Sequence, residues 1–255
     1  AKEYTISVNG TKYESFAEGW AAITEGAVVT LMADLELSQI LTINKAITLD
    51  GNGKTLTSTA GRAINVETDG EVEIKNLTIN AGERAVNIIN KAATVELNNV
   101  TATANNNAVM IATSAGAVKL TVNNSDLTGL AVVNVAGAGA QVAINNTDIT
   151  NVDASSAENY GAITIWSSAE AANVTVNGGN ITASDDSREA YVFPADATIE
   201  GVEDVGYIVA TIGDAGFETL EAAIKAAKAG QTIKLIRDIT ASQIITIDKS
   251  ITIDG

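Results

Sequence analysis

The sequence contains no cysteine and no histidine among its 255 residues. Without these residues the chain can form no disulfide bond, no Cys/His zinc site, no cysteine nucleophile and no histidine acid–base catalyst. Proline occurs once, at Pro194, and aromatic residues make up only 4% of the chain. Because 46% of the residues are nonetheless hydrophobic, the core must consist of Val, Ile, Leu and Ala, a composition that favours flat, layered β-strands.

Basic residues are also scarce, since 15 Lys and Arg stand against 31 Asp and Glu and give a formal net charge of −16. Phosphate-binding surfaces need clustered Lys and Arg, so we expect no nucleic-acid partner. No apolar run approaches the roughly 18 residues of a membrane-spanning helix. No basic segment precedes an apolar one at the start. We therefore expect no membrane insertion of this segment, and any signal peptide or wall anchor to lie outside it.

A short unit recurs along the chain: an apolar strand, a turn containing Asn, and a second apolar strand. It reads VEIKNLTIN at 72–80, VELNNVTAT at 95–103, LTVNNSDLT at 120–128, VAINNTDIT at 142–150 and VTVNGGNIT at 174–182. Alignment of the turns places in one column Asn76, Asn99, Asn124, Asn146 and finally Gly178. These members are 23, 25, 22 and 32 residues apart, and a period of this size is the signature of a solenoid.

Each unit also holds a third strand, at 63–66, 85–88, 108–111, 132–135, 162–165 and 190–193. Three short strands per turn predict an all-β parallel β-helix whose coils stack about 4.8 Å apart. Alternation places Val72, Ile74 and their equivalents inside as apolar ladders, with Thr78 and its equivalents outside. The longer steps indicate loops inserted after Asn151 and Ser184, and inserted loops are where solenoids tend to bind ligands.

Helical spacing of apolar residues predicts short amphipathic helices at about 14–25 and 217–229. The first helix precedes the first coil, so we expect it to cap the N-terminal end of the stack. The last 50 residues repeat the first 50, and SQILTINKAITLDG (38–51) aligns with SQIITIDKSITIDG (242–255) at an offset of 204. We therefore expect a β-helix module over 1–205, and over 206–255 the start of a second copy that docks on its C-terminal end. Since the pattern stops within a coil, we expect the natural protein to continue.

Short coils with a stacked Asn turn, over residues 28–200, resemble the right-handed, single-stranded parallel β-helix of the pectin-lyase-like superfamily. Among its members the chain is most similar to tandem-module bacterial surface and adhesin-like proteins. The resemblance implies an extracellular location on the bacterial cell surface and a non-enzymatic function as a stalk or adhesin. The implied partners are a host or cell-surface protein or glycan, and neighbouring copies of the module. A polysaccharide-binding or lyase-like, polysaccharide-degrading β-helix remains the alternative.

The superfamily's lyases combine a calcium-binding acidic cluster with an Arg or Lys base, and its hydrolases use acidic residues from adjacent coils. Here Asp126 would stack near Asp148 with no basic residue in the same column, and Asp185, Asp186 and Arg188 share an inserted loop. Solvated polar positions explain both sets, so we predict no catalytic residue, no metal ligand and no cofactor. Calcium needs only oxygen ligands, yet no EF-hand or RTX spacing supports a calcium site.

The expected ligand or partner face is an apolar outer surface on the third strands. If Val86, Ile88 and their equivalents point inward, outward positions fall to Ile89, Met110, Val132 and Trp166, beside Ala85, Ala108, Ala112 and Ala162. Exposed apolar patches usually mark contact surfaces, and Tyr160 in the neighbouring loop would add a second aromatic ring for a glycan or a protein. The alternative is that an inserted loop covers this face. The Asn column itself needs no ligand, because left-handed turns and amide stacking explain it.

Overall fold

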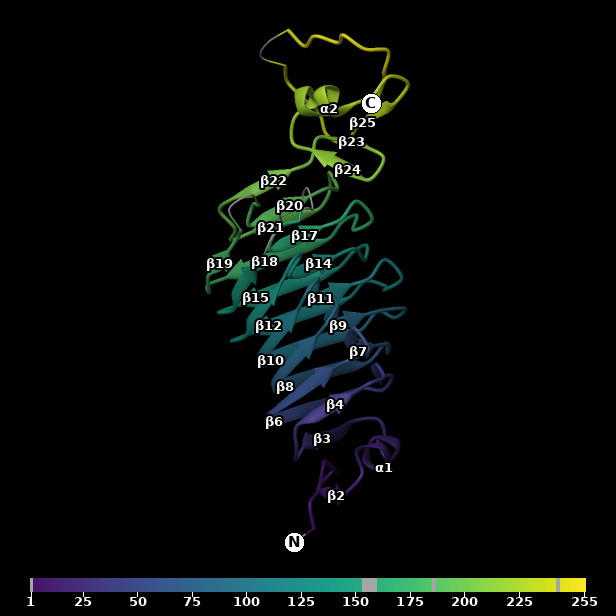
Figure 1. The fold of residues 1–255 in the computed structure, drawn as a ribbon, viewed down its shortest axis with the longest axis vertical. Helices are drawn as coiled ribbons and strands as arrows, with labels where there is room; N and C mark the ends of the chain where they lie inside the picture. The colour runs from purple at the N-terminus through teal and green to yellow at the C-terminus, as the bar shows by residue number, and fades with distance from the viewer. Residues whose placement is uncertain (1, 153–159, 185–186, 242–243) are drawn as a thin grey trace.

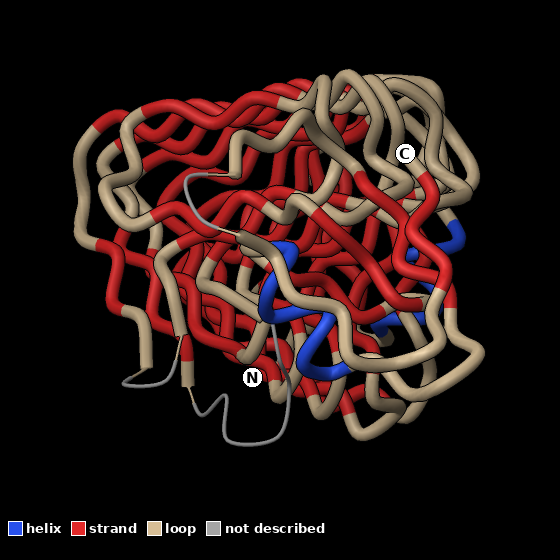
Figure 2. Tube along the Cα trace, turned by 90° about the horizontal axis from the view of Figure 1, so that it is seen from above, coloured by secondary structure: helices blue, strands red, loops and turns tan. Residues whose placement is uncertain are grey.

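The computed structural model describes residues 2–152, 160–184, 187–241 and 244–255, and shows a β-solenoid of about nine turns (Figure 1). Strands make up 49% of the chain and helices 5%. Seen from above, successive coils lie over one another (Figure 2). The parallel β-helix predicted from the repeat is therefore confirmed.

The larger sheet has 14 strands and follows two sides of each coil. Its early coils use one long, bent strand each: β6 (Ile47–Ser58), β8 (Glu71–Ala81) and β10 (Thr94–Ala104). Later coils break at the bend into β12 (Lys119–Asn123) and β13 (Asp126–Gly129), β15 (Gln141–Asn145) and β16 (Asp148–Asn151), and β18 (Asn173–Asn177) and β19 (Ile181–Thr182). The stack begins with β3 (Ala27–Leu31) and β4 (Leu35–Leu37) and ends with β21 (Thr198–Glu200).

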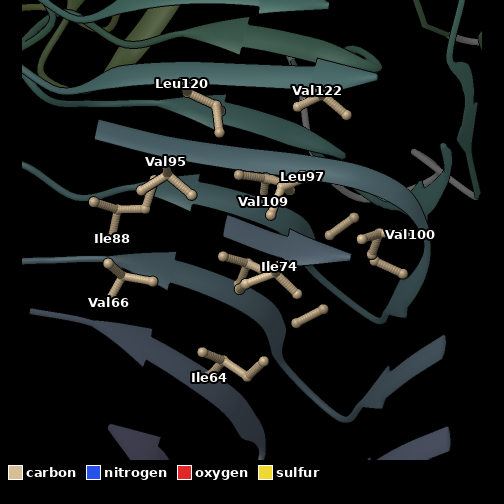
Figure 3. Packing of buried hydrophobic residues seen from close by; sticks show 14 of the residues in the cluster. Ile64, Val66, Ile74, Ile88, Val95, Leu97, Val100, Val109, Leu120 and Val122 are labelled. Carbon is tan, nitrogen blue, oxygen red and sulfur yellow. The ribbon is translucent and has the colours of Figure 1, made fainter. Parts of the chain in front are cut away.

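The third side of the coils is an eight-stranded parallel sheet whose strands coincide with the third strand expected in each unit. These are β5 (Leu41–Ile43), β7 (Arg62–Val66), β9 (Arg84–Ile88), β11 (Asn107–Ile111), β14 (Val133–Val135), β17 (Ile163–Ile165), β20 (Ala190–Val192) and β22 (Val205–Tyr207). Between the two sheets, ladders of aliphatic side chains such as Ile64, Ile74 and Leu97 pack against one another (Figure 3). Because Val, Ile, Leu and Ala are small and stack in layers, the core needs no aromatic anchor.

At the bend of the larger sheet, each coil turns through a residue with a left-handed backbone. Five asparagines have φ between 46° and 54°, and Gly178 follows at 73°; they are Asn52, Asn76, Asn99, Asn124 and Asn146. Asn99 donates a 2.9 Å hydrogen bond to Asn76, and Asn146 donates a 2.8 Å bond to Asn124. Asn adopts the left-handed conformation at lower cost than most side chains, so turn geometry and amide bonding both favour this residue here.

A second amide column, which the repeat did not predict, runs one residue before the first. Asn123 donates to Asn98 at 2.8 Å, Asn145 to Asn123 at 2.8 Å, and Asn177 to Asn145 at 3.0 Å. Glu73 ends the column by accepting a 2.9 Å bond from Asn98. The Asn-Asn dipeptide therefore supplies one residue for the left-handed turn and one for bonding between coils.

The prediction of an exposed apolar face on the smaller sheet is wrong. Four of its expected members, Ala85, Ala108, Val132 and Ala162, are fully buried in the main core, and Met110 exposes only 9% of its surface. The strand ladder pairs Arg62 with Arg84 and Ile64 with Val86 but skips the residues between them. Consecutive residues at this corner thus both face the core instead of alternating. The register column between these core positions is mostly polar, and all of its members except Asn65 are buried; it consists of Asn65, Asn87, Met110, Asn134 and Thr164.

A hairpin as well as a helix closes the N-terminal end of the stack, whereas the sequence predicted only the helix for this role. β1 (Ile6–Val8) pairs antiparallel with both β2 (Thr11–Tyr13) and β3. The helix α1 (Phe16–Ala21) is shorter than the expected 14–25, because the Ser15 side chain caps its start and Ala22 already lies at its C-cap. We call residues 4–33 the first cap.

The same arrangement recurs, residue for residue, in residues 208–237, which we call the second cap. Its elements are β23 (Ala210–Ile212), β24 (Ala215–Phe217), α2 (Leu220–Ala226) and β25 (Thr232–Leu235), and β26 (Thr252–Asp254) pairs with β25. Ala210 pairs with Phe217 as Ile6 pairs with Tyr13, an offset of 204 residues. These four strands form a sheet and a buried cluster of their own, at the end of the stack opposite the N-terminus (Figure 1).

Candidate functional site

All ten aromatic residues of the chain lie near its two ends, and none falls between residues 21 and 159. Four belong to the first cap. The other six lie in the segment where the last coils meet the second cap: Tyr160, Trp166, Tyr191, Phe193, Tyr207 and Phe217. Aromatic side chains bury the largest apolar areas and often anchor contact surfaces. We therefore take this junction as the candidate functional site.

Three aromatic rings form a continuous series at the end of the solenoid. Tyr160 packs edge-on against Trp166, with ring centroids 5.3 Å apart and an interplanar angle of 78°. The other side of Trp166 contacts Phe193, with centroids 4.9 Å apart. Phe193, Tyr191 and Ile208 are buried together in a small cluster distinct from the main core. Trp166, just after β17, thus contacts two rings and packs against the cluster that includes Ile208 at the start of the second cap.

Arg188, just before β20, joins the last coils to the second cap through charge. Its Nε donates a 2.9 Å hydrogen bond to Glu218, which follows β24, and a second guanidinium nitrogen lies 2.8 Å from the other carboxylate oxygen. Arg188 also pairs with Asp204. The hydrogen bonds that it donates to Glu218 and Asp204 raise the pKa of Arg188. A bidentate arginine–carboxylate pair fixes orientation as well as distance, so this contact sets the angle of the hairpin.

Arg237, just after β25, reaches back toward the last coils and donates hydrogen bonds to backbone carbonyls. It donates to Ile208 at 3.1 Å, to Ala195 at 3.1 Å and to Val192 at 3.4 Å, and it also contacts the carbonyl of Pro194. Its guanidinium lies 5.2 Å from the centre of the Tyr207 ring, a cation–π contact. Burial lowers the pKa of Arg237. These carbonyls lie at the end of β20, in the turn that follows it and at Ile208, so the side chain links the second cap to the last coils.

Beside Arg237 the junction leaves a cleft of about 360 Å³ between the solenoid and the second cap. Phe193 and Leu235 form part of its apolar lining, while Glu170 and Asp196 on the solenoid side and Lys234 on the cap side supply charge. A cleft with both charge signs and an apolar wall can accept a polar ligand with an apolar face, such as a sugar ring.

The residues singled out from the sequence fall in different places. Tyr160, Trp166 and Arg188 meet at the junction, whereas Ile89 and Met110 lie on earlier coils, half-buried and buried. Asp185 and Asp186 lie outside the described residues. Asp126 and Asp148 occupy the same register position on adjacent coils and are both exposed. Asp148 accepts bonds from the backbone and side chain of Asn180 at 2.8 and 2.9 Å, so its carboxylate is used in binding the next coil.

The sequence did not single out the residues that carry the junction, Arg237, Phe193 and Glu218 among them. One signal was available. At the offset of 204, Arg237 stands where the first cap has Ala33, and Tyr207 stands where the chain has Glu3. At these positions one copy has a small or acidic residue and the other has a side chain that can contact a neighbour. Such a difference indicates that the two copies lie in different surroundings.

Among the residues that the structure describes, no three His, Cys, Asp or Glu side chains converge in a group able to hold a metal ion. Within the same residues, no helix is both long and apolar enough to cross a membrane. Comparisons with protein-family models, with curated proteins and with solved structures find no match to this chain.

Proposed function

We propose that this chain is a non-enzymatic structural and adhesive module of a bacterial cell-surface protein, similar in design to pectin-lyase-like surface proteins. The observation that carries the proposal is the second cap, which repeats the first at 204 residues in both sequence and strand register. It is joined to the solenoid by Arg188 and Arg237. A cap that merely ended a solenoid would have no reason to recur after the last coil. Recurrence supports an array of solenoids joined end to end.

The physical basis of such a stalk is its continuous bonding along the axis. Each coil pairs with the next through parallel strand ladders, and the two amide columns add side-chain hydrogen bonds in the same direction. Solenoid stability is a sum of such contacts between neighbours, so a stack of many coils resists bending and lengthens without changing its cross-section. In this proposal the coils give the stalk its length, and the junction fixes the orientation of one module relative to the next.

Location is tested by antibody labelling of intact and permeabilised cells of the species that produces the protein. We expect labelling of intact cells, and labelling that appears only after permeabilisation contradicts the proposal.

Adhesion is tested by coating beads with the chain and measuring their retention on host-cell and bacterial surfaces. Beads coated with a soluble acidic protein of similar charge control for electrostatic effects.

The cleft of about 360 Å³ beside Phe193 favours one second candidate, a polysaccharide-binding or polysaccharide-degrading β-helix. A screen against acidic and neutral polysaccharides, with and without calcium, separates the two. Turnover contradicts the non-enzymatic proposal. Glycan binding without turnover, abolished by Glu170→Gln together with Asp196→Asn at the cleft, identifies the adhesive surface as a glycan site.

A further inference from the structure

The two caps of this chain share one fold but present different docking faces. The solenoid end contacts the second cap at two positions in particular, Gly216 in the hairpin and Arg237 after β25. At an offset of 204 the first cap has Lys12 and Ala33 at these positions. The glutamate that binds Arg188 is common to both caps, because Glu218 corresponds to Glu14, and Glu14 instead pairs with Lys2.

Gly216 lies directly against the ring of Phe193. A Cβ placed on Gly216 would come within 2.7 Å of Phe193 Cε1 and within 3.1 Å of two atoms of Ile208. Phe193 exposes only 2% of its surface and also contacts Trp166, with ring centroids 4.9 Å apart. Any residue larger than glycine at this position must therefore displace the Phe193 ring or push the hairpin away from the solenoid.

The hairpin itself does not require glycine at this place. Lys12 occupies the same position in the first cap, with the same antiparallel pairing to the neighbouring strand, since Ser7 pairs with Lys12 as Thr211 pairs with Gly216. In the first cap the lysine ammonium lies 5.6 Å from the centre of the Tyr4 ring. The glycine is thus needed for docking and not for the fold of the cap.

Arg237 supplies the second requirement. It donates to the carbonyls of Val192 and Ala195 on the solenoid, and an alanine at this position would remove both hydrogen bonds. Hydrogen bonds from a charged donor are stronger than neutral ones, so the solenoid end favours a cap that carries the arginine.

We infer that the C-terminal end of the solenoid selects its cap: it binds a cap with glycine opposite Phe193 and arginine after the third cap strand, and it rejects the first cap, which carries Lys12 and Ala33. The partner that fits this surface is its own second cap or the second cap of another copy. Identical chains therefore do not exchange caps from head to tail, although both caps have the same fold. The inference rests on the proposed tandem arrangement for its biological role, but its test does not depend on cellular location.

The test installs first-cap residues in the second cap of the full chain. The junction variant is Gly216→Lys with Arg237→Ala. The matched control, Glu221→Ala with Lys228→Thr, also installs first-cap residues, but at exposed positions of the second cap away from the contacts with Phe193 and the last coil. Because the chain has no cysteine, Thr113→Cys and Ala226→Cys allow two spin labels, one on the solenoid and one on α2, whose distance distribution reports docking.

We expect a narrow distance distribution for the parent chain and for the control variant, and its loss in the junction variant, with the helical circular dichroism signal retained. Addition of Phe193→Ala to Gly216→Lys alone should recover the narrow distribution, since it removes the ring that the lysine meets. A junction variant that keeps the parent distribution overturns the inference. So does a control variant that broadens it equally, or a failure of Phe193→Ala to recover docking while the cap remains helical.

Discussion

The first and second caps have the same strand register, yet each packs its helix on its hairpin with a different pair of residues. In the first cap Gly19 lies against Ile6, and a Cβ on Gly19 would come within 2.2 Å of Ile6 Cγ2. The second cap has Ala223 and Ala210 at the equivalent positions, buried in one cluster. In the first cap a large side chain on the strand faces a residue without a side chain on the helix. In the second cap two alanines occupy these positions. The contact keeps the two side chains small enough to fit together, but it does not conserve residue type.

The caps also differ in the large side chains that their helices carry. Phe16 and Trp20 stack in the first cap with centroids 5.5 Å apart, and Leu220 and Ile224 stand at these positions in the second. The second cap gains its contacts elsewhere, from Arg237 and Phe193 of the junction. The same backbone arrangement therefore closes the start of the solenoid and packs against its last coils. The side chains that differ between the two copies are those whose contacts differ.

Substitution of Gly19 by Ala should have the largest effect. The added methyl overlaps the buried Ile6 side chain, so we expect the first cap to lose about 3 kcal/mol of stability, the upper end of the range for overpacking. Hydrogen exchange of β1 amides measures the loss. Addition of Ile6→Ala reproduces the pair of the second cap and should recover most of it, and a double variant no more stable than the single one contradicts complementary packing.

A lysine from outside each cap binds carbonyls at the end of the cap helix, and the lysine beside the second cap makes more of these hydrogen bonds. Lys249 donates to the carbonyls of Ile224, Lys225 and Ala227 at 3.0, 2.8 and 2.9 Å, whereas Lys45 donates to Ile23 alone. Hydrogen bonds to charged groups contribute about 2 kcal/mol, so Lys249→Met should destabilise α2 by about that amount. Lys45→Met is the matched control with a smaller expected loss, and equal losses in hydrogen exchange would show that the number of carbonyl contacts does not matter.

Helix capping should show a smaller difference of the same kind. The Thr219 hydroxyl accepts from Ala222 N at 3.1 Å, and the Ser15 hydroxyl accepts from Glu18 N at 3.5 Å. Loss of an N-cap side chain costs about 1 kcal/mol, so Thr219→Ala should destabilise its helix by about this much and Ser15→Ala by less. Urea unfolding followed at the helical signal checks the order, and a larger loss at Ser15 would reverse the comparison.

The smallest expected effect is a pH dependence of docking that only the second cap should show. Burial first, and then the negative charge of Glu218, raise the pKa of Tyr191 above its usual value near 10. A folded-state pKa above the unfolded value means that the folded state holds its proton longer. Stability is therefore full below about pH 10 and falls as the pH rises beyond it.

The distance between the labels at positions 113 and 226 measures this opening between pH 9 and 11. We expect broadening in the parent chain at the upper end of this range and less broadening with Tyr191→Phe, which cannot ionise. Hydrogen exchange in the first cap serves as the internal control, because Tyr191 lies at the other end of the stack. Equal broadening in the parent and in Tyr191→Phe would assign the effect to another group.

Much of the solenoid was predictable because its signals are local and repeated. Val72 and Ile74 alternate with polar residues in every coil, and an Asn at each bend provides the left-handed turn, so strand positions and register follow from alignment of the units. Corners of the smaller sheet were not predictable in this way. Ala85 and Val86 both face the core, since the chain changes direction there and strict alternation fails.

The junction was only partly predictable. Tyr160, Trp166 and Arg188 stood out as aromatic or charged residues near inserted loops, and all three lie at the junction. Arg237 and Gly216 carried no local motif. Their partners, the carbonyl of Val192 and the ring of Phe193, are more than 20 residues away in the sequence, so no pattern within one unit links them.

The coil therefore follows from the sequence alone, through the positions of its strands, its Asn turns and the recurrence of the helix and first strands at 204 residues. These properties depend on side-chain periodicity and on backbone preferences, which act over a few residues. The faces buried at the corners, and the contacts between the second cap and the last coils, follow from the packing of the folded chain. Those outcomes depend on distances between atoms from remote segments, such as the contact at Gly216, where a Cβ would come within 2.7 Å of Phe193.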